Sequence, residues 1–425
     1  MSKKFEKSKS KKTGGALPFK KALAFVGAHK IAFGAGALFL VAAAAGSGFA
    51  FRQFRKAKNQ TVRVGFYNLP EKVTTSIEET IKNSDSVATG FKTISPEEIS
   101  SGKYLKSYDL IFTFDGLEAD TLKKEAANIS GNIYNFLPTS VRRENETDFR
   151  KSVPLLFDHF EFSYNKNVAQ KIGAENPKTY EELLDFLEFS KKYTFSPFFT
   201  NGGDDEILLS LITTFIEGLG GYSAYEDFVR TVKKQPSFEK ICAQKLGNSE
   251  ITLLDILDIL RSWQESGIVH PNWYNAKFRD CIAFMSDGQV AVFFTKLSVH
   301  RTIPYKVIKD FSTGRFPVSL KAGDHAVIAP AVCAVKISKK SASDRILTRL
   351  LDEEGQTRLS LQTQLAPVAL RGESYDIQAD DVRFFAASCR YGNRPGIYSA
   401  AFSADSAQAQ KLCESIRNYL SKGKI

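Results

Sequence analysis

After residue 60, short apolar runs that are typical of strands are separated by segments whose apolar positions recur at helical spacing. The segments TVRVGFY (61–67), GFKTIS (90–95) and DLIFTFD (109–115) are short, apolar and rich in β-branched and aromatic residues, which predicts three strands. Residues 71–82, between the first two, repeat apolar positions at helical spacing. Because a helix between consecutive strands implies a crossover connection, we expect parallel pairing in an α/β lobe.

The ends of these strands indicate where a ligand would lie. Ligands of open α/β sheets bind beyond the carboxyl ends of the strands. Tyr67 and Asn68 follow the first strand, and Thr113, Phe114 and Asp115 end the third. These residues are candidates for the lining of a cleft, although polar residues after strands also serve as ordinary turn formers.

The longest apolar run lies near the N-terminal end. Residues 31–51, IAFGAGALFLVAAAAGSGFAF, contain no charged side chain, and about 20 helical residues span the ~30 Å hydrocarbon core of a bilayer. Nine lysines precede the run and four basic residues follow it closely, which predicts a cytoplasmic N-terminus and an exported C-terminal portion. A cleaved secretory signal is the alternative, but its hydrophobic region is usually only about 7–15 residues long. We therefore expect one transmembrane helix that acts as a signal anchor.

Charge is divided unevenly between this N-terminal part and the rest of the chain. Of the 58 Lys and Arg, 13 lie in residues 1–58, together with one of the 47 Asp and Glu. The remaining chain therefore holds 45 basic and 46 acidic residues, so the net charge of +11 belongs to the N-terminal part. Because a nucleic-acid surface needs excess positive charge on the folded part, we expect no nucleic-acid partner.

Sequence patterns for catalysis and for cofactors are missing. The chain has no GxxxxGK[ST] phosphate loop, no HExxH or paired Cys/His zinc spacing and no GxSxG nucleophile elbow. The five histidines are scattered, and the five cysteines are widely spaced without a CxxC pair. We therefore expect no enzyme activity, no metal and no cofactor, and we assign no disulfide.

Residues 153–193 carry a connected set of signals. An apolar extended run contains Asp158 and leads to YNK (164–166), and a turn at Pro177 is followed by the helix start TYEEL (179–183). This segment resembles the family 1 extracellular solute-binding proteins, which include the maltose-binding and other oligosaccharide-binding proteins of ABC importers.

Three further segments resemble the same family in the same order. They are FSPFFTNGGDDEILLSLITTFIEGLGG (195–221), AFMSDGQVAVFFTKLSVHR (283–301) and LLDEEGQTRLSLQTQLAPVA (350–369). Each motif is weak alone, whereas four in sequence, covering roughly residues 62–370, identify the chain as a member of the family.

The resemblance implies an α/β fold, a two-lobed periplasmic-binding-protein-like clamp with interlobe crossings, preceded by the one N-terminal transmembrane helix. Two α/β lobes around a hinge close over a small molecule and remove it from water. The expected crossings lie near residues 153–160, 293–298 and 326–335. The expected division of the chain is a basic cytoplasmic tail at 1–30, the transmembrane helix at 31–51, a linker at 52–61, lobe 1 at 62–157 and 298–328, and lobe 2 at 158–297 and 329–425.

The resemblance also implies a cleft lined by aromatic and polar side chains. Aromatic faces hold the C–H patches of a sugar, and planar polar groups hold its hydroxyls. Asp158 occupies the position at which family members often place an acid, but a hinge hydrogen-bond acceptor is an equal alternative. The candidate ligand-binding residues are Tyr67, Asn68, Phe114, Asp115, Asp158, His159, Asn201, Trp273, Tyr274, Phe294, Lys296 and Tyr398.

The two tryptophans carry different expectations. Trp263 lies at helical spacing with Ile256 and Leu260, which predicts a place in the core. Trp273 and Tyr274 follow in a Pro-Asn turn, where stacking on a ligand and packing in the core are both open.

The resulting functional expectation is a membrane-tethered binding protein of the bacterial cytoplasmic membrane, single-pass, with its C-terminal domain in the periplasm. It would capture a small polar solute, with carbohydrate favoured, and deliver it to an ABC permease. The alternative is a sensor or assembly subunit that keeps the fold with a degenerate cleft. Peptides and polyamines stay open as solutes, because neither tryptophan falls in the first lobe.

Overall fold

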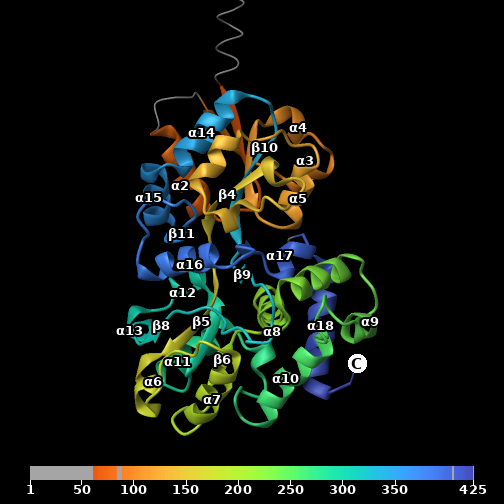
Figure 1. Ribbon diagram of the computed structural model, residues 1–425, viewed down its shortest axis with the longest axis vertical. Helices are drawn as coiled ribbons and strands as arrows, with labels where there is room; N and C mark the ends of the chain where they lie inside the picture. Colours follow the sequence, from red (N-terminus) through yellow and green to blue (C-terminus); the bar gives the residue numbers. More distant parts are fainter. Residues whose placement is uncertain (1–60, 84–88, 404–405, 425) are drawn as a thin grey trace, which may run out of the picture. The chain divides into compact units, whose positions relative to one another are not determined.

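The computed structural model describes residues 61–83, 89–403 and 406–424. The expected cytoplasmic tail, the transmembrane helix and all of the linker except Thr61 lie outside the described residues. Within the described part, the strands gather into two main sheets, each accompanied by helices (Figure 1). We use lobe 1 for the six-stranded sheet with its helices and lobe 2 for the four-stranded sheet with its helices.

The sheet of lobe 1 has the strand order β11-β4-β10-β3-β1-β2. β1 (Val62–Phe66) pairs in parallel with both β2 (Thr89–Thr93) and β3 (Leu110–Phe114). The helix α2 (Glu71–Lys82) forms the connection between β1 and β2 that parallel pairing requires. The three strands and the helix predicted for this segment are therefore confirmed.

Later segments of the chain complete lobe 1. β10 (Ala331–Lys336) lies antiparallel between β3 and β4 (Ser152–Phe157), and β11 (Ala366–Pro367) extends the edge beside β4. The helical elements of this lobe are α3 (Pro96–Ser100), α4 (Tyr104–Ser107), α5 (Leu117–Lys123), the 3-10 turns Gly131–Phe136, Thr139–Arg142 and Phe149–Lys151, α14 (Ser341–Leu351), α15 (Glu353–Thr363) and α16 (Ile377–Ser388).

The sheet of lobe 2 has the strand order β6-β7-β5-β8. β5 (Phe160–Asn165) is antiparallel to β7 (Val292–Lys296) and to β8 (Phe311–Ser312), and β6 (Phe198–Thr200) is parallel to β7. Every residue of β5 and β6 is buried, so both faces of this sheet are covered. The shorter helical elements of this lobe are α6 (Lys166–Ile172), α7 (Tyr180–Ser190), α9 (Phe238–Ala243), α10 (Leu253–Glu265), the 3-10 turn Trp273–Asn275, α11 (Phe278–Ser286), α12 (Leu297–His300), α13 (Tyr305–Ile308), α17 (Ile397–Ala401) and α18 (Ala407–Lys422).

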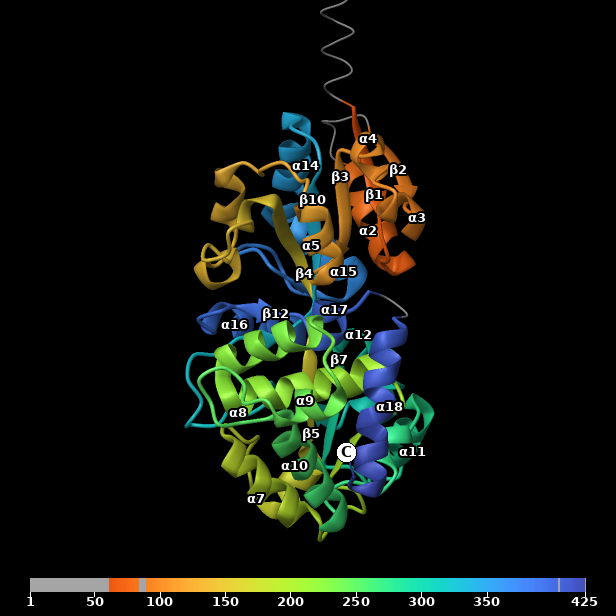
Figure 2. The same cartoon turned by 90° about the vertical axis from the view of Figure 1, so that its right-hand side faces the viewer.

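The helical segment α8 (Asp205–Lys233), which is kinked at Gly221, lies in lobe 2 with α10 and α18 packed beside it (Figure 2). Asp204 caps its N-terminus, because the Asp204 carboxylate accepts hydrogen bonds from the amides of Glu206 and Ile207 at 2.9 and 3.2 Å. The length and composition of α8 would suit a membrane span, but 89% of its most apolar window is buried inside the protein. Core burial therefore accounts for the apolar composition of α8.

The chain passes between the two sheets three times. The first passage, Asp158 and His159, joins β4 to β5. The second, Ala329 and Pro330, joins β9 (Val327–Ile328) to β10. The third runs from α16 to α17 through β12 (Asn393–Arg394), which pairs in parallel with β9. The first two passages lie within the crossings expected at 153–160 and 326–335.

The crossing expected at 293–298 is wrong, and so are the lobe boundaries that depend on it. β7 is followed by α12, α13 and β8, and β8 returns to β5 within the sheet of lobe 2. β10 and β11 in turn belong to the sheet of lobe 1. Residues 298–328 were expected in lobe 1 but lie with lobe 2. Residues 329–392 were expected in lobe 2 but lie with lobe 1. A strand of two residues, such as β8, carries no pattern that would show in advance which sheet it joins.

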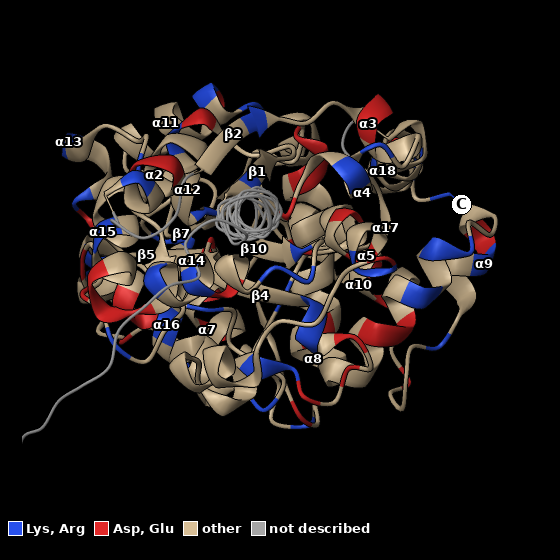
Figure 3. Cartoon of the chain, turned by 90° about the horizontal axis from the view of Figure 1, so that it is seen from above, with Lys and Arg blue, Asp and Glu red and all other residues tan. Residues whose placement is uncertain are grey.

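Basic and acidic residues are interspersed along the ribbon in the view of Figure 3. This distribution agrees with the balance of 45 basic and 46 acidic residues after residue 58.

Candidate binding site

The ends of β1 and β3 meet the start of α17 around a small hollow, which we call the aromatic pocket. Four residues expected at the site, Asn68, Phe114, Asp115 and Tyr398, come together here from distant parts of the chain. The volume of the pocket is about 40 Å³. Its full lining is Asn68, Phe114, Asp115, Glu118, Tyr398, Ser399 and Phe402.

Hydrogen bonds hold the polar side of the aromatic pocket in place. Asn68 Nδ2 donates to Glu118 Oε1 and Thr113 Oγ1 donates to Glu118 Oε2, both at 3.0 Å. Asn68 has a left-handed backbone with φ of +51°, which asparagine adopts more readily than most residues. Tyr67 lies half-buried behind this group, and burial together with Glu118 raises the pKa of its hydroxyl.

The backbones of the two lobes approach closely beside the aromatic pocket. A Cβ atom at Gly116 would lie 2.2 Å from the carbonyl oxygen of Ser399 in α17. The φ angle of Gly116 is +121°, which side chains other than glycine rarely allow. Glycine is therefore required here by both the backbone angle and the contact. Asp115 lines the pocket on one side of this contact and a larger cavity on the other.

We call this larger hollow the charged cavity, and its volume is about 370 Å³. Residues before α5, within α5 and after the 3-10 turn Thr139–Arg142 supply one wall, and α8 supplies the opposite wall. The residues after β12 close it. The full lining is Asp115, Gly116, Asp120, Lys123, Arg143, Glu146, Tyr222, Tyr225, Glu226, Val229, Arg230, Lys233, Arg394, Pro395 and Ala400.

An ion pair between Asp115 and Arg143 is buried in the wall of the charged cavity. Arg143 Nη2 donates to Asp115 Oδ2 at 2.5 Å and to the carbonyl oxygen of Asn393 at 3.0 Å. Burial alone would raise the pKa of Asp115, but Arg143 and Lys123 outweigh it and lower the pKa to about 2. The carboxylate of Asp115 is therefore charged at neutral pH.

Further ion pairs and rings connect opposite walls of the charged cavity. Lys233 Nζ lies 3.5 Å from the Asp120 carboxylate, and Arg394 Nη2 lies 3.3 Å from the Glu146 carboxylate. The Arg394 guanidinium also lies 5.0 Å from the centre of the Tyr222 ring, whose neighbour Tyr391 stacks at 3.8 Å. Segments of lobe 1 are thereby tied to α8 and to β12.

Asp158 acts as a hydrogen-bond acceptor at the first crossing. Its carboxylate accepts from the amide and hydroxyl of Ser298 at 2.9 and 2.5 Å, and from the amide of His159 at 3.0 Å. Burial raises the pKa of Asp158, although Lys296 and these hydrogen bonds act in the opposite direction. Lys296 itself pairs with Glu206 at 2.6 Å. The acceptor role that the sequence left open for Asp158 is the one seen here.

His159 and Asn201 are buried polar side chains with unused hydrogen-bonding groups. Both ring nitrogens of His159 and Oδ1 of Asn201 have no partner among the described residues. Burial lowers the pKa of His159 to about 4, so the ring is neutral at physiological pH. Neither residue lines the aromatic pocket or the charged cavity.

Three candidate residues lie in the core of lobe 2 and not at a cleft. Trp273, Tyr274 and Phe294 are buried, and Phe294 stacks on Phe160 with ring centres 5.9 Å apart. These residues pack in the core, and the ligand-stacking role considered for Trp273 and Tyr274 stays a prediction. Trp263, which was expected in the core, is buried there.

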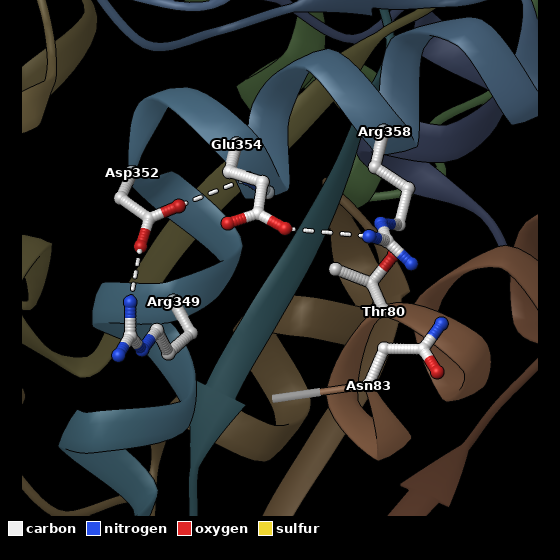
Figure 4. A pocket seen from close by; sticks show the side chains of 7 residues that line it. Thr80, Asn83, Arg349, Asp352, Glu354 and Arg358 are labelled. Atoms are coloured by element: carbon white, nitrogen blue, oxygen red, sulfur yellow. Dashed lines mark hydrogen bonds and ion pairs between the residues drawn. The ribbon is translucent and has the colours of Figure 1, made fainter. Parts of the chain in front are cut away.

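A further polar pocket lies between α2 and α15 in lobe 1 (Figure 4). Its charged side chains pair with one another, Arg349 with Asp352 and Arg358 with Glu354, each at 3.3 Å. The pocket shares no residue with the aromatic pocket or the charged cavity. We assign no function to it.

Some residues of the two hollows had no signal in the sequence. Arg143 lies after a short 3-10 turn, and no motif of the sequence includes Lys123 or Arg394. Glu118 lies in the first turn of α5, immediately after the strand end that was predicted to be functional. Glu118 could therefore have been predicted from the rule that ligands bind beyond the carboxyl ends of strands, whereas the three cations could not.

Among the described residues, no group of three or more His, Cys, Asp or Glu side chains is placed to hold a metal ion. The five cysteines are buried and free. Burial raises the pKa of their thiols. The pKa of Cys389 rises to about 11 and that of Cys242 to about 12.

Comparison of the sequence gives no match to a family model and none to a curated protein. Comparison of the structure finds solute-binding proteins. The bacterial solute receptor AcbH, described as having an exclusive preference for β-D-galactopyranose, gives a TM-score of 0.69 at 14% identity, over 86% of this chain and 93% of that one. The binding protein MsmE of Bacillus subtilis, in an open conformation, gives 0.65 at 13% identity, over 85% and 93%.

A family 1 extracellular solute-binding protein of Bifidobacterium longum subsp. infantis gives a TM-score of 0.61 at 14% identity, over 86% of this chain and 95% of that one. Likeness at such low identity establishes the fold alone. The described residues therefore have the two-lobed α/β fold of the extracellular solute-binding proteins, as the four sequence motifs indicated. The proteins compared here are binding proteins and not enzymes.

Proposed function

We propose that this protein is a binding protein that closes its two lobes over a small polar solute, with a carbohydrate as the favoured ligand. The observation that carries the proposal is the convergence of Asn68, Asp115, Glu118 and Tyr398 from both lobes on one pocket. Amide and carboxylate groups bind hydroxyls, and the neighbouring ring of Phe114 offers an apolar face. The preference described for AcbH supports a sugar, because AcbH has the same fold.

The volume of the aromatic pocket implies that the lobes move. A volume of about 40 Å³ is far below the range of about 300–1,000 Å³ that is usual for small-molecule sites. A sugar ring therefore enters only after α17 and the N-terminal end of α5 separate. The three passages between the sheets are the natural hinge for this opening.

We further propose that residues 31–51 hold the protein in the bacterial cytoplasmic membrane, with the two lobes on the periplasmic side. The uncharged run and the excess of lysines before it support this topology. An ABC permease is the proposed partner, because a tethered clamp raises the effective concentration of solute at a membrane-bound transporter. No catalytic step belongs to this role.

A second candidate is a sensor or assembly subunit with a degenerate cleft. The observation that favours it is the set of contacts that join the lobes, including the close approach of Gly116 to Ser399 and the ion pair of Lys233 with Asp120. A cleft that stays shut by its own contacts would not respond to solutes.

Thermal unfolding of the full-length chain in detergent, with a panel of sugars, sugar acids, amino acids, peptides and polyamines, separates the two candidates. A ligand at 100 times its dissociation constant stabilises the folded state by about 2.7 kcal/mol, which shifts the midpoint by a few degrees. A shift with one solute class supports the binding protein. No shift with any member, from a protein that unfolds cooperatively, contradicts it and favours the second candidate.

A further inference from the structure

We infer that the charged cavity takes a negatively charged group of the solute, so that the ligand is a sugar bearing a carboxylate or a phosphate. The inference rests on the proposed function and narrows its ligand class. It depends on which charges are buried in the cavity wall, on an unused donor there and on the position of the cavity beside the aromatic pocket.

Buried cations outnumber buried anions in this wall. The side chains of Lys123, Arg143 and Arg394 are only 8%, 13% and 8% exposed. Asp115, which is 4% exposed, is the single acidic side chain of the lining that is buried as deeply. Removing a charge from water is unfavourable unless another charge and hydrogen bonds compensate for it. Two of the three buried cations therefore lack an equally buried counter-charge.

The remaining acidic residues of the lining stand at the rim. Asp120 and Glu146 reach Lys123 and Arg394 at 3.1 and 3.3 Å, but their own side chains are 46% and 37% exposed. Glu226 is exposed as well, and it accepts a hydrogen bond from the Tyr222 hydroxyl at 2.8 Å. Solvent screens the attraction of such exposed carboxylates. They neutralise the inner cations only in part, so an anion that enters the cavity from water meets a positive interior.

Arg143 also has an unused donor. Its Nε is buried and has no hydrogen-bond partner among the described residues. The Glu146 carboxylate lies 4.0 Å from this atom, beyond hydrogen-bond distance. A guanidinium offers donors in a planar fork that matches a carboxylate or a phosphate, and such bonds are strong because both partners are charged.

The charged cavity lies beside the aromatic pocket, which indicates where the sugar ring of the ligand binds. Tyr222 has Tyr391 stacked on it and Arg394 over its ring, so its faces are in use. The aromatic pocket, with Phe114, Tyr398 and Phe402, lies on the other side of the contact between Gly116 and Ser399.

When the lobes part, this contact opens and the two hollows join along Asp115. The sugar ring then lies against the aromatic side chains while its charged substituent reaches Arg143. A volume of about 370 Å³ lies within the range of about 300–1,000 Å³ that is usual for small-molecule sites.

The test is a calorimetric titration of the full-length chain with matched pairs of neutral and charged sugars. The pairs are galactose with galacturonate, glucose with glucuronate, and glucose with glucose 6-phosphate. We expect the charged member of at least one pair to bind ten times more tightly or better. The uronates and the phosphate ester tell whether a carboxylate or a phosphate is the preferred group.

Two variants and one control connect the effect to the cavity. Arg143→Gln and Lys123→Met are each expected to weaken the charged sugar at least tenfold and to change the neutral sugar less than twofold. Arg349→Gln, which also removes an arginine with a single ion pair in lobe 1, is expected to change neither. The thermal midpoint of each variant shows whether it folds, and Lys123→Met retains the test if Arg143→Gln does not.

The outcomes are distinguishable. Equal or tighter binding of the neutral member in every pair overturns the inference and leaves the proposed binding function standing. Equal weakening of neutral and charged sugars by the variants also overturns it. If no sugar of either kind binds to the folded protein, the carbohydrate-binding function fails and the inference fails with it.

Discussion

At the scale of single residues, burial decides which polar groups are charged. Asp115 keeps its charge because Arg143 is bonded to it, and its pKa falls to about 2. His159 has no partner for its ring among the described residues, and burial lowers its pKa to about 4. Asp115 is thus charged and His159 neutral at physiological pH, because Asp115 has a charged hydrogen-bond partner and the His159 ring has none among the described residues.

The titration of His159 predicts a loss of stability in mild acid. An exposed histidine has a pKa of about 6.5, so below that pH the unfolded chain binds a proton that the folded protein excludes until about pH 4. Stability is therefore complete above the unfolded pKa and falls as the pH decreases. We expect the free energy of unfolding to drop by about 2 kcal/mol between pH 7 and pH 5 from this residue.

Urea unfolding at several pH values measures this contribution. His159→Leu is expected to remove this part of the pH dependence, since the ring makes no hydrogen bond among the described residues that leucine would lose. His270→Gln is the control and leaves it in place. An unchanged pH dependence in His159→Leu would show that His159 is not the group responsible.

The packing role of Trp273 gives a second prediction. Trp273→Ala is expected to lower the free energy of unfolding by about 3–5 kcal/mol, because it leaves a cavity in the core of lobe 2. Phe384→Ala is a control for loss of an aromatic ring at an exposed position, 67% exposed, and is expected to cost less than about 0.5 kcal/mol. If Trp273→Ala unfolds like the parent protein and instead loses solute, the ligand-stacking role is restored.

Particular residues show how far sequence patterns reach. Asn68, Phe114 and Asp115 were predicted because they follow strands, and strands have a period that can be recognised. Trp273 was a candidate because it lies in a turn, and Phe294 because the family resemblance implies an aromatic cleft. Both are buried in the core of lobe 2, and the sequence pattern does not separate aromatic residues of a core from those of a cleft. Arg143 was missed because it sits in irregular backbone with φ of +55°, where no periodicity exists.

At the scale of elements, the contact between α5 and α17 is the feature that couples fold to function. Asp115 and Gly116 lead from β3 into α5, and Ser399 and Ala400 belong to α17. Each element therefore lines both hollows and also touches the other lobe. Movement of either element changes the pockets and the contact together.

Gly116→Ala tests this coupling. The added methyl group would lie 2.2 Å from the Ser399 carbonyl oxygen, and only separation of α5 from α17 relieves that clash. We expect the variant to fold, to favour an open arrangement of the lobes and to bind solute less than twofold more weakly, because the same contact has to open before a sugar ring fits. Calorimetric titration measures the affinity.

Gly131→Ala is the matched control, because a Cβ at Gly131 meets nothing within 4 Å. It is expected to retain the parent affinity. A tenfold loss of affinity in Gly116→Ala, with parent affinity in Gly131→Ala, would mean that α5 has to meet α17 again in the bound state.

Long strands and capped helices could be predicted from the sequence, whereas the shortest strands could not. The strands β1, β2 and β3 were recognised from apolar runs, and the capped start of α7 from Thr179, whose hydroxyl accepts from the amide of Glu182 at 3.2 Å. β8 and β9 have two residues each and were not predicted. Short strands depend on tertiary partners, so the local sequence contains little of the information that forms them.

At the scale of the whole molecule, three passages between two sheets produce a clamp. Two lobes with separate cores and few connections can change their relative position at small cost within each core. Ion pairs such as Lys233 with Asp120 join the walls of the charged cavity, but both side chains are partly exposed and the pair contributes little. Such pairs therefore oppose separation of the two lobes only weakly.

Closure of the lobes over a solute is measured as the distance between the two lobes before and after solute is added. Spin labels at Lys92→Cys in lobe 1 and Lys178→Cys in lobe 2 occupy exposed positions, whereas the native cysteines are buried. Electron–electron distance measurements on the full-length chain would be made without solute and with the solute that most raises its thermal midpoint. For a solute-binding clamp we expect a broad or mixed distribution of label-to-label distances without solute. The distribution should narrow to one short distance when solute is bound. A distribution that stays the same under every solute of the panel would contradict the claim that this protein is a solute-binding clamp.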